Sequence, residues 1–215
     1  MEKTINAIEQ HKIIVIVRGV EKEKLISTVQ AMYDGGIRLV ECTYDASGNI
    51  PDEDIAENIR MLSDYFDGKM FVGAGTVLTK KQVELTQKAG GKFIISPDTN
   101  TDVIAFTKQC GLVSIPGAIT PTEVATAHRA GADFVKLFPI DLYGPKYIKI
   151  LRAPLSNVRV LAVNGITADN MTDYLEAGAC GVGVGSGIVN KQRIAENDFA
   201  AITELAKGYT KKINA

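Results

Sequence analysis

One unit recurs along this chain of 215 residues: an apolar run rich in β-branched residues, a loop, an amphipathic stretch, and a stop of small residues that includes glycine. The unit returns about every 19 to 32 residues, which suits strand-then-helix repeats. The eight apolar runs are Ile13–Val17, Leu39–Cys42, Met70–Val72, Phe93–Ile95, Leu112–Ile115, Phe134–Phe138, Val158–Val163 and Val182–Val184. Eight strands alternating with helices predict an α/β chain that closes into a (β/α)8 TIM barrel, although an open doubly wound sheet could produce a similar alternation.

The stretches between these runs carry helix start and stop signals. Thr120-Pro121-Thr122-Glu123 combines a capping threonine, a proline at the first helical position and a glutamate that can complete a capping box. Thr79–Gln82 offers a similar start, and Gly35-Gly36 offers a stop. An N-terminal helix over Thr4–His11 and a C-terminal helix over Phe199–Ile213 are expected to complete a single barrel domain over residues 1–215.

Composition narrows the classes of function. A net charge of -1 and the lack of a long basic run argue against a nucleic-acid partner. Cys42, Cys110 and Cys180 are odd in number and widely spaced, which is typical of reduced thiols in a cytoplasmic protein. His11 and His128 are the only histidines, and no cluster has metal-ligand spacing, so no metal is expected. The apolar runs are too short to cross a bilayer, so neither a membrane partner nor export is expected.

The most informative residue is a lysine inside the sixth apolar run. Strand alternation places Lys136 with Phe134 and Phe138 on one face and leaves the other face to Val135 and Leu137. Both faces are apolar, which indicates a strand covered on both sides. Desolvation lowers the pKa of a buried ammonium group and leaves more free amine to condense with a ketone as a Schiff base. The alternatives are a structural lysine paired with a buried carboxylate and a lysine whose stem snorkels out of the sheet.

A glutamate is expected to face this lysine across the barrel. Glu41 lies near the end of the second apolar run, and strands two and six are on opposite sides of an eight-stranded barrel. Apolar neighbours raise the pKa of a carboxyl group by desolvation, whereas a nearby lysine lowers it. Such a pair could shuttle protons during Schiff-base formation and carbon–carbon cleavage, or it could be a structural ion pair inside the barrel.

Two further features suit an anionic ligand. Gly183–Gly187 follows the eighth run, where barrels often bind phosphate with backbone N–H groups, although a small-residue turn without a ligand is the alternative. It fails as a dinucleotide fingerprint because it closes the chain instead of opening a first strand–helix unit. Arg18, at the end of the first run, could hold a carboxylate bidentately or pair with Glu41.

Six motifs occur in a fixed order along nearly the whole chain. They are Val-Glu-Cys-Thr at 40–43, Gly-Ala-Gly-Thr-Val-Leu at 73–78, Ile-Ser-Pro at 95–97, Ile-Pro-Gly at 115–117, Val-Lys-Leu-Phe-Pro at 135–139 and Gly-Val-Gly-Ser at 183–186. Together they resemble the class I 2-keto-3-deoxy-6-phosphogluconate (KDPG) aldolase family, which includes 4-hydroxy-2-oxoglutarate (KHG) and 2-keto-3-deoxy-6-phosphogalactonate (KDPGal) aldolases. Ile-Val-Arg-Gly-Val at 16–20 and Tyr-Gly-Pro-Lys-Tyr-Ile-Lys at 143–149 are closer to the galactonate branch.

The resemblance implies a trimeric TIM barrel that cleaves a 2-keto-3-deoxy sugar acid into pyruvate and an aldehyde such as glyceraldehyde 3-phosphate. By position, Lys136 would form the Schiff base and Glu41 would be the general acid and base. The remaining implied contacts are Thr76, Pro97 and Phe138 at the pyruvate end, Arg18 on the carboxylate, and Gly165, Gly185 and Ser186 at the distal phosphate. Because the protonated imine withdraws electrons from the bond being broken, the resemblance implies no cofactor and no metal.

Two positions depart from the family pattern, and a nearby loop adds acidic residues to the mouth of the barrel. Asp45 stands where gluconate-type members often have an arginine, so Arg18 must supply the positive charge. Val163-Asn164-Gly165 stands where members commonly have two glycines, which puts the Asn164 side chain at a phosphate-facing position. The predicted loop Tyr44–Asp54 adds carboxylates near the mouth, and these either form a solvated acidic loop or repel a dianionic phosphate.

Two other functions stay open from the sequence. A phosphosugar isomerase or epimerase could use Glu41 as its base and the glycine loop as its phosphate grip, and its turnover would survive Lys136→Ala. A non-catalytic barrel that binds sugar acids would be stabilised by its ligand without any turnover.

Overall fold

Strands and helices alternate along the chain in the computed structural model, which describes residues 1–213. The strands are β1 (Ile13–Val17), β2 (Leu39–Thr43), β3 (Phe71–Gly75), β4 (Phe93–Ile95), β5 (Val113–Ile115), β6 (Gly117–Ala118), β7 (Val135–Leu137), β8 (Val160–Val163) and β9 (Gly181–Val184). The helices are α1 (Glu2–His11), α2 (Lys22–Asp34), α3 (Asp52–Tyr65), α4 (Lys80–Lys88), α5 (Thr101–Gln109), α6 (Pro121–Arg129), α7 (Pro145–Arg152), α8 (Met171–Glu176), α9 (Lys191–Ala195) and α10 (Phe199–Ile213), with a 3-10 turn η1 (Ile140–Leu142) before α7.

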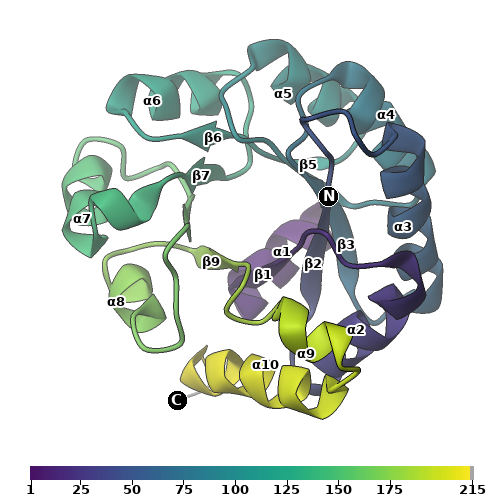
Figure 1. Ribbon diagram of the computed structural model, residues 1–215. Helices are drawn as coiled ribbons and strands as arrows, with labels where there is room; N and C mark the ends of the chain where they lie inside the picture. The colour runs from purple at the N-terminus through teal and green to yellow at the C-terminus, as the bar shows by residue number, and fades with distance from the viewer. Residues whose placement is uncertain (214–215) are drawn as a thin grey trace.

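The strands form one parallel sheet that curls round on itself. Its order is β5-β4-β3-β2-β1-β9-β8-β7-β6, so the two outermost strands belong to the single stretch 113–118. The N–H groups of Phe134 and Lys136 donate to the carbonyls of Ser114 (3.2 Å) and Pro116 (2.9 Å), which joins that stretch to β7. The helices form an outer ring around the strands (Figure 1). The predicted α/β barrel is therefore confirmed.

The fifth predicted strand is interrupted. The expected run Leu112–Ile115 begins one residue later as β5, and the chain resumes pairing after Pro116 as β6. Proline has no N–H to donate to a strand ladder, so the ladder breaks at this residue. The next N–H, from Gly117, leaves the ladder and donates to the carbonyl of Asp98 at 3.1 Å.

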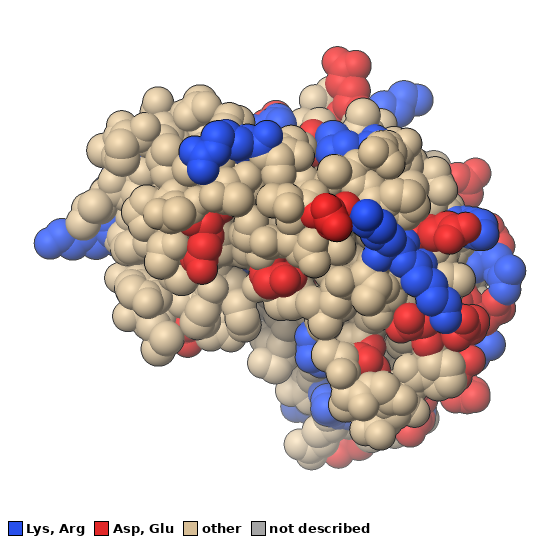
Figure 2. Space-filling view, turned by 90° about the horizontal axis from the view of Figure 1, so that it is seen from above, with Lys and Arg blue, Asp and Glu red and all other residues tan. Residues whose placement is uncertain are grey.

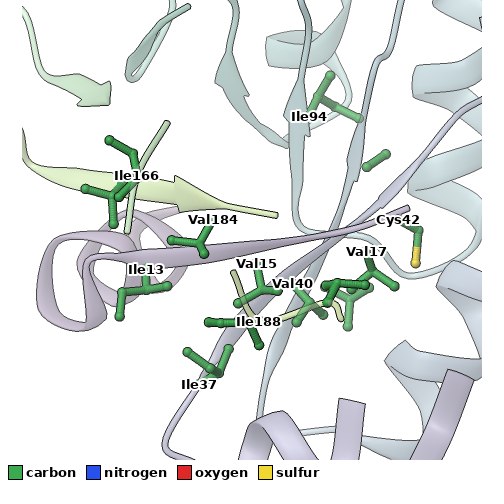
Figure 3. Close-up of a cluster of buried hydrophobic side chains, with 14 of the residues drawn as sticks. Ile13, Val15, Val17, Ile37, Val40, Cys42, Ile94, Ile166, Val184 and Ile188 are labelled. Atoms are coloured by element: carbon green, nitrogen blue, oxygen red, sulfur yellow. The ribbon is translucent and has the colours of Figure 1, made fainter. Parts of the chain in front are cut away.

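Side chains alternate between the barrel interior and a layer beneath the helices. In β1, Ile13, Val15 and Val17 belong to an outer apolar layer, which Figure 3 shows together with Val40 and Cys42 of β2. The residues between them face the interior, because successive side chains of a strand point to opposite faces. The parity of a residue within its strand thus decides whether it meets a helix or the lumen.

An apolar plug closes the amino-terminal end of the barrel. The plug combines Ala7 and Ile8 of α1 with buried residues of the strand segments, namely Ile14, Leu39, Phe93, Ile95, Val113, Ile115, Phe134, Leu161 and Val163. Figure 1 shows α1 crossing behind the strands. The predicted N-terminal helix is therefore present, and it leaves the opposite end of the barrel for a site.

Helix boundaries follow the local signals. In α6, Thr120 Oγ1 accepts from the Glu123 N–H (3.3 Å) and the Glu123 carboxylate accepts from the Thr120 N–H (2.8 Å). The same capping box, made by Thr79 and Gln82, begins α4, and α10 has the predicted bounds Phe199–Ile213. Within residues 1–213, no helix has both the length and the apolar character needed to cross a bilayer.

Candidate active site

Lys136 lies in the middle of β7 with its side chain directed into the barrel. The residue is only 9% exposed, and its strand neighbours in register are Gly117 and Leu161. Its Nζ lies 4.6 Å from the ring centroid of Phe138, which shares the same face. Burial lowers the pKa of Lys136, and Arg18 lowers it further, whereas Glu41 acts in the opposite direction. The surroundings therefore favour the neutral amine more than water does.

Glu41 lies in β2 and is 2% exposed. Its neighbours in register are Ile16 of β1 and Gly73 of β3. Burial raises the pKa of its carboxyl group from the ordinary 4.5 to about 7, although Lys136 and Arg18 both act to lower it. Its Oε2 is buried and has no hydrogen-bond partner within the described chain. Glu41 can thus hold or release a proton near neutral pH.

The glycines of β3 make room for this carboxyl group. A Cβ on Gly75 would lie 2.6 Å from both Cδ and Oε1 of Glu41. A Cβ on Gly73 would lie 2.4 Å from the ring of Phe93, which fills the barrel below. In the sequence these glycines stand out only as part of the family motif at 73–78. The structure shows that the space left free by Gly75 is filled by the Glu41 carboxyl group, and the space left free by Gly73 is filled by the Phe93 ring.

Glu41 and Lys136 line the same cleft, as the strand positions predict. No salt bridge joins them in the part of the chain that the structure describes. Both also border a small chamber beneath the cleft, whose other lining residues are Ile14, Ile16, Ile95, Ile115, Leu161, Val163 and Gly183. The structural ion pair considered from the sequence is therefore not formed, and both polar groups stay available to a ligand.

Arg18 follows β1 at the mouth of the cleft. Its Nη2 donates to Thr76 Oγ1 at 3.0 Å, and among the salt bridges of residues 1–213 none joins it to Glu41. Thr76 follows β3 with φ +54°, a left-handed conformation that is uncommon for a β-branched residue and often marks a functional constraint. The contact directs the guanidinium group across the cleft from the β1 end to the β3 end.

The loop after β8 supplies the far side of the cleft. Asn164 and Gly165 both have left-handed backbones, with φ +88° and +68°. Asparagine tolerates this conformation better than most residues, so the loop keeps its shape despite the departure from two glycines. A Cβ on Gly165 would lie 2.4 Å from the Cβ of Asp141, which excludes a side chain there. Asn164 and Gly165 are exposed, and so is Ser186 in the loop after β9.

A single cleft of ≈ 560 Å³ brings all ten predicted site residues together. They are Arg18, Glu41, Thr76, Pro97, Lys136, Phe138, Asn164, Gly165, Gly185 and Ser186. Sequence reasoning missed Thr167 and Tyr209, which also line it. Tyr209 comes from α10, and no strand-end signal points to a residue so far along the chain. Its hydroxyl lies 3.5 Å from the Ile166 carbonyl.

The acidic loop does not face this cleft. The Asp45 carboxylate accepts from the Ser47 hydroxyl (2.7 Å) and from the N–H groups of Ser47, Asn49 and Ile50. These bonds, chiefly those from Ser47, lower the pKa of Asp45. The loop also ends earlier than expected, because residues 52–54 form the first turn of α3, where carboxylates favour the helix dipole. Of the two alternatives for this loop, the structure therefore favours a solvated acidic loop, and none of its carboxylates lines the cleft.

The histidines and cysteines lie away from the cleft lining. The His128 ring pairs with the Asn157 side chain at 2.9 Å, and His11 is in α1. Burial raises the pKa of the Cys42 thiol to about 12, which makes it unreactive. In residues 1–213, no group of three or more His, Cys, Asp and Glu side chains could hold a metal ion.

Comparisons with known proteins agree with this geometry. The family model described as KDPG and KHG aldolase matches residues 4–205. The chain belongs to this family. The 2-dehydro-3-deoxy-6-phosphogalactonate aldolase of Escherichia coli is 33% identical over 202 residues, covering 94% of this chain and 96% of that protein. A 2-dehydro-3-deoxy-phosphogluconate aldolase of Treponema pallidum is also 33% identical, over 94% of this chain and 93% of that protein.

Solved structures of the family have the same barrel. A native KDPGal structure superposes with a TM-score of 0.83 at 33% identity, covering 93% of this chain and 92% of that one. The KDPG aldolase of Legionella pneumophila, with pyruvate captured as a covalent carbinolamine, superposes with a TM-score of 0.86. At 24% identity over 97% of this chain and 99% of that one, the second likeness supports the fold alone. The chain is thus an aldolase of the KDPG and KHG family, a carbon–carbon lyase.

Proposed function

We propose that Lys136 is the Schiff-base nucleophile of this aldolase and that Glu41 is its general acid and base. One observation carries the proposal: a single cleft holds a buried lysine of lowered pKa and a buried carboxyl group with one unpartnered oxygen. Burial of this kind, combined with a specific charged neighbour, is typical of catalytic groups. The Lys136 amine and the Glu41 carboxyl group do not form a direct ion pair with each other, so both can contact a substrate.

The reaction follows from these two groups. The amine of Lys136 adds to the C2 ketone of the substrate, and loss of water gives a protonated imine that withdraws electrons. Glu41 takes the proton of the C4 hydroxyl while the C3–C4 bond breaks, so the aldehyde leaves and the pyruvyl fragment remains as an enamine. Glu41 returns its proton to C3, and water hydrolyses the imine to release pyruvate and the free amine.

The remaining cleft residues suit a substrate with an anion at each end. Arg18, held by Thr76, is placed to bind the carboxylate, with Pro97 and Phe138 against the pyruvyl carbons. The distal phosphate then falls to the loops after β8 and β9, where barrels commonly bind phosphate; the residues concerned are Asn164, Gly165, Gly185 and Ser186. The E. coli relative and the motifs at 16–20 and 143–149 favour the 6-phosphogalactonate type of substrate.

Pyruvate release from a panel of substrates tests this function. The panel compares 2-keto-3-deoxy-6-phosphogalactonate, its gluconate epimer and 4-hydroxy-2-oxoglutarate, with wild type and Lys136→Ala. We expect the galactonate compound to have the highest kcat/KM and Lys136→Ala to release no pyruvate. Pyruvate release by Lys136→Ala at a rate near that of wild type would refute the role proposed for Lys136.

We also propose that the protein is a homotrimer. Leu142, Tyr143 and Ile150, in and beside η1 and α7, are 74%, 51% and 60% exposed and form an apolar patch. Figure 2 shows few charged side chains on the side of α6 and α7, whereas many gather on the side of α3 and α4. Further copies of the chain are the occupants we propose for this patch. Sedimentation equilibrium should report three copies for wild type and a smaller species for Leu142→Lys with Ile150→Lys; a monomeric wild type would refute the trimer.

The location and domain structure complete the proposal. We place the protein in the cytoplasm, with one barrel domain over residues 1–215. All three cysteines, Cys42, Cys110 and Cys180, are free thiols, as a reducing compartment allows. A single cooperative unfolding transition would support one domain, and two separate transitions would refute it.

A further inference from the structure

A second hollow of ≈ 420 Å³ opens beside the catalytic cleft. Its lining residues are Ile16, Arg18, Gly185, Ser186, Val189, Asn190 and Lys191. Ile16, Arg18, Gly185 and Ser186 line the cleft as well, so the two spaces share a wall. Among the described residues, one charged side chain lines the second hollow without also lining the cleft, that of Lys191, the first residue of α9.

The side chain of Lys191 reaches from the β9 loop towards the β1 loop. Its Nζ lies 3.7 Å from the position that a Cβ on Gly19 would occupy. Gly19 has φ +67°, so the absence of a side chain there is required by the backbone and also leaves space for the lysine. Lys191 is exposed and forms no ion pair within residues 1–213. Its charge is available to a ligand.

The segment that carries Lys191 is anchored on the barrel. The Asn190 side chain accepts from the Arg193 N–H at 3.1 Å and so caps α9. Lys24 of α2 donates to the carbonyls of Ile194 (3.2 Å) and Ala195 (2.9 Å) at the other end of the helix. Ile194 itself is buried. The backbone of Lys191 is therefore fixed, and only its side chain needs to be ordered when a ligand binds.

The charges around the two spaces favour a ligand with more than one negative charge. Their lining residues include Arg18, Lys136 and Lys191 but a single carboxyl group, that of Glu41. Arg18 is directed towards Thr76 at the β3 side, and Lys136 lies deep in the barrel. Lys191 is thus the cation that belongs to the same loop segment as Ser186. The backbone N–H groups of that loop can orient a phosphate but bring no full charge of their own.

We propose that Lys191 binds the distal phosphate of the substrate and determines the preference for phosphorylated sugar acids. The proposal rests on the function proposed above. Loss of one charged contact to a phosphate corresponds to about a tenfold weaker interaction. Lys191 touches the substrate far from the bond that breaks, so its effect falls on KM and not on kcat.

The test compares Lys191→Met with wild type on a matched pair of substrates, 2-keto-3-deoxygalactonate with and without its 6-phosphate. We expect KM for the phosphorylated substrate to rise about tenfold, while kcat and the constants for the unphosphorylated one stay within about twofold. Inorganic phosphate should also inhibit Lys191→Met about tenfold less strongly than wild type. Lys22→Met, at an exposed lysine that begins α2 and lies outside both linings, is the matched control and should behave as wild type.

Each outcome separates this proposal from the proposed function. If Lys191→Met changes KM equally for both substrates, or for neither, Lys191 does not bind the distal phosphate. A wild type that shows no preference for the phosphorylated substrate would overturn the proposal in the same way. In each of these cases, pyruvate release that still requires Lys136 would leave the aldolase function intact.

Discussion

The two ends of the barrel interior are built from the same alternating strand positions but do different work. At the amino-terminal end these positions carry Phe93, Val113 and Leu161, which form one buried apolar cluster with Ala7 and Ile8 of α1. Two residues beyond Leu39 and Phe134 of the plug, the same face carries Glu41 and Lys136. The comparison teaches that the apolar plug does more than stabilise the fold, because it forms the dry floor whose desolvation shifts the pKa of both charged groups.

The largest effect on activity is expected from a substitution that makes the catalytic end of the barrel as apolar as the amino-terminal plug. Lys136→Met replaces the amine with an apolar side chain and should lower kcat/KM by at least about 10⁴-fold, the scale on which loss of a nucleophile acts. Its free energy of unfolding should not fall, because the desolvated ammonium group is removed. Pyruvate release and urea denaturation measure the two quantities. Near-normal activity, or a large loss of stability, would contradict the proposed division of roles.

The reverse change acts on the plug. Phe93 is fully buried and its ring fills the space that a side chain on Gly73 would take, so Phe93→Ala should lower the free energy of unfolding by about 3–5 kcal/mol. The folded fraction should still form the Schiff base, because no polar group of the cleft is removed. Urea denaturation and borohydride trapping on the same sample check the two halves of this prediction. If trapping falls by more than the folded fraction does, Schiff-base formation at Lys136 depends directly on the packing of Phe93, contrary to this prediction.

A smaller effect is expected where the two ends meet, at Gly75. Gly75→Ala would place a methyl group 2.6 Å from the Glu41 carboxyl carbon and so displace the acid. We expect kcat to fall about a hundredfold, at the low end of what a misplaced general acid–base group costs. Gly208→Ala is the control, because a Cβ there meets nothing within 4 Å. Equal activity of the two variants would mean that Glu41 does not need its observed position.

The smallest effect is a shift in the titration of Glu41. Its pKa of about 7 should rise in Lys136→Met and also in Arg18→Met, with the larger rise in Lys136→Met, because the lysine has the greater lowering influence. Carbon-13 NMR of the labelled carboxyl group measures both. A fall in either variant would contradict the assigned causes.

The same raised pKa has a consequence for stability. Between pH 4.5 and 7 the unfolded chain releases a proton that folded Glu41 retains, so Glu41 makes the folded protein less stable as the pH rises through this window. The free energy of unfolding of wild type minus that of Glu41→Gln should therefore fall with pH over that range. A difference that rises with pH would mean that the folded carboxyl group has a pKa below its ordinary value.

Much of this architecture could be predicted from the sequence because the strands alternate in a simple way. The parity that puts Lys136 between two phenylalanines, and the capping box at Thr120, are local signals that the fold preserves. Glu41 could be placed opposite the lysine because barrel geometry fixes which strand ends face each other. The motifs then supplied the family, which the match over residues 4–205 confirms.

Other features depend on contacts that no local pattern encodes. The need for glycine at 75 comes from the Glu41 side chain on the neighbouring strand, and Tyr209 enters the cleft from a helix at the far end of the chain. The sequence left open whether the carboxylates of the 44–54 loop repel a phosphate or only form a solvated acidic loop; the hydrogen bonds of Asp45 to its own loop favour the second. Lys191 had no signal at all, since a lysine opening a short helix is ordinary until its neighbours are known.

The central claim is that a single buried amine, that of Lys136, forms the bond to pyruvate. Incubation of the protein with pyruvate and borohydride, followed by proteolysis and mass spectrometry, tests it most directly. The account predicts one reduced pyruvate adduct per chain, located on Lys136 and lost in Lys136→Met. An adduct on any other lysine, or none in wild type, would contradict it.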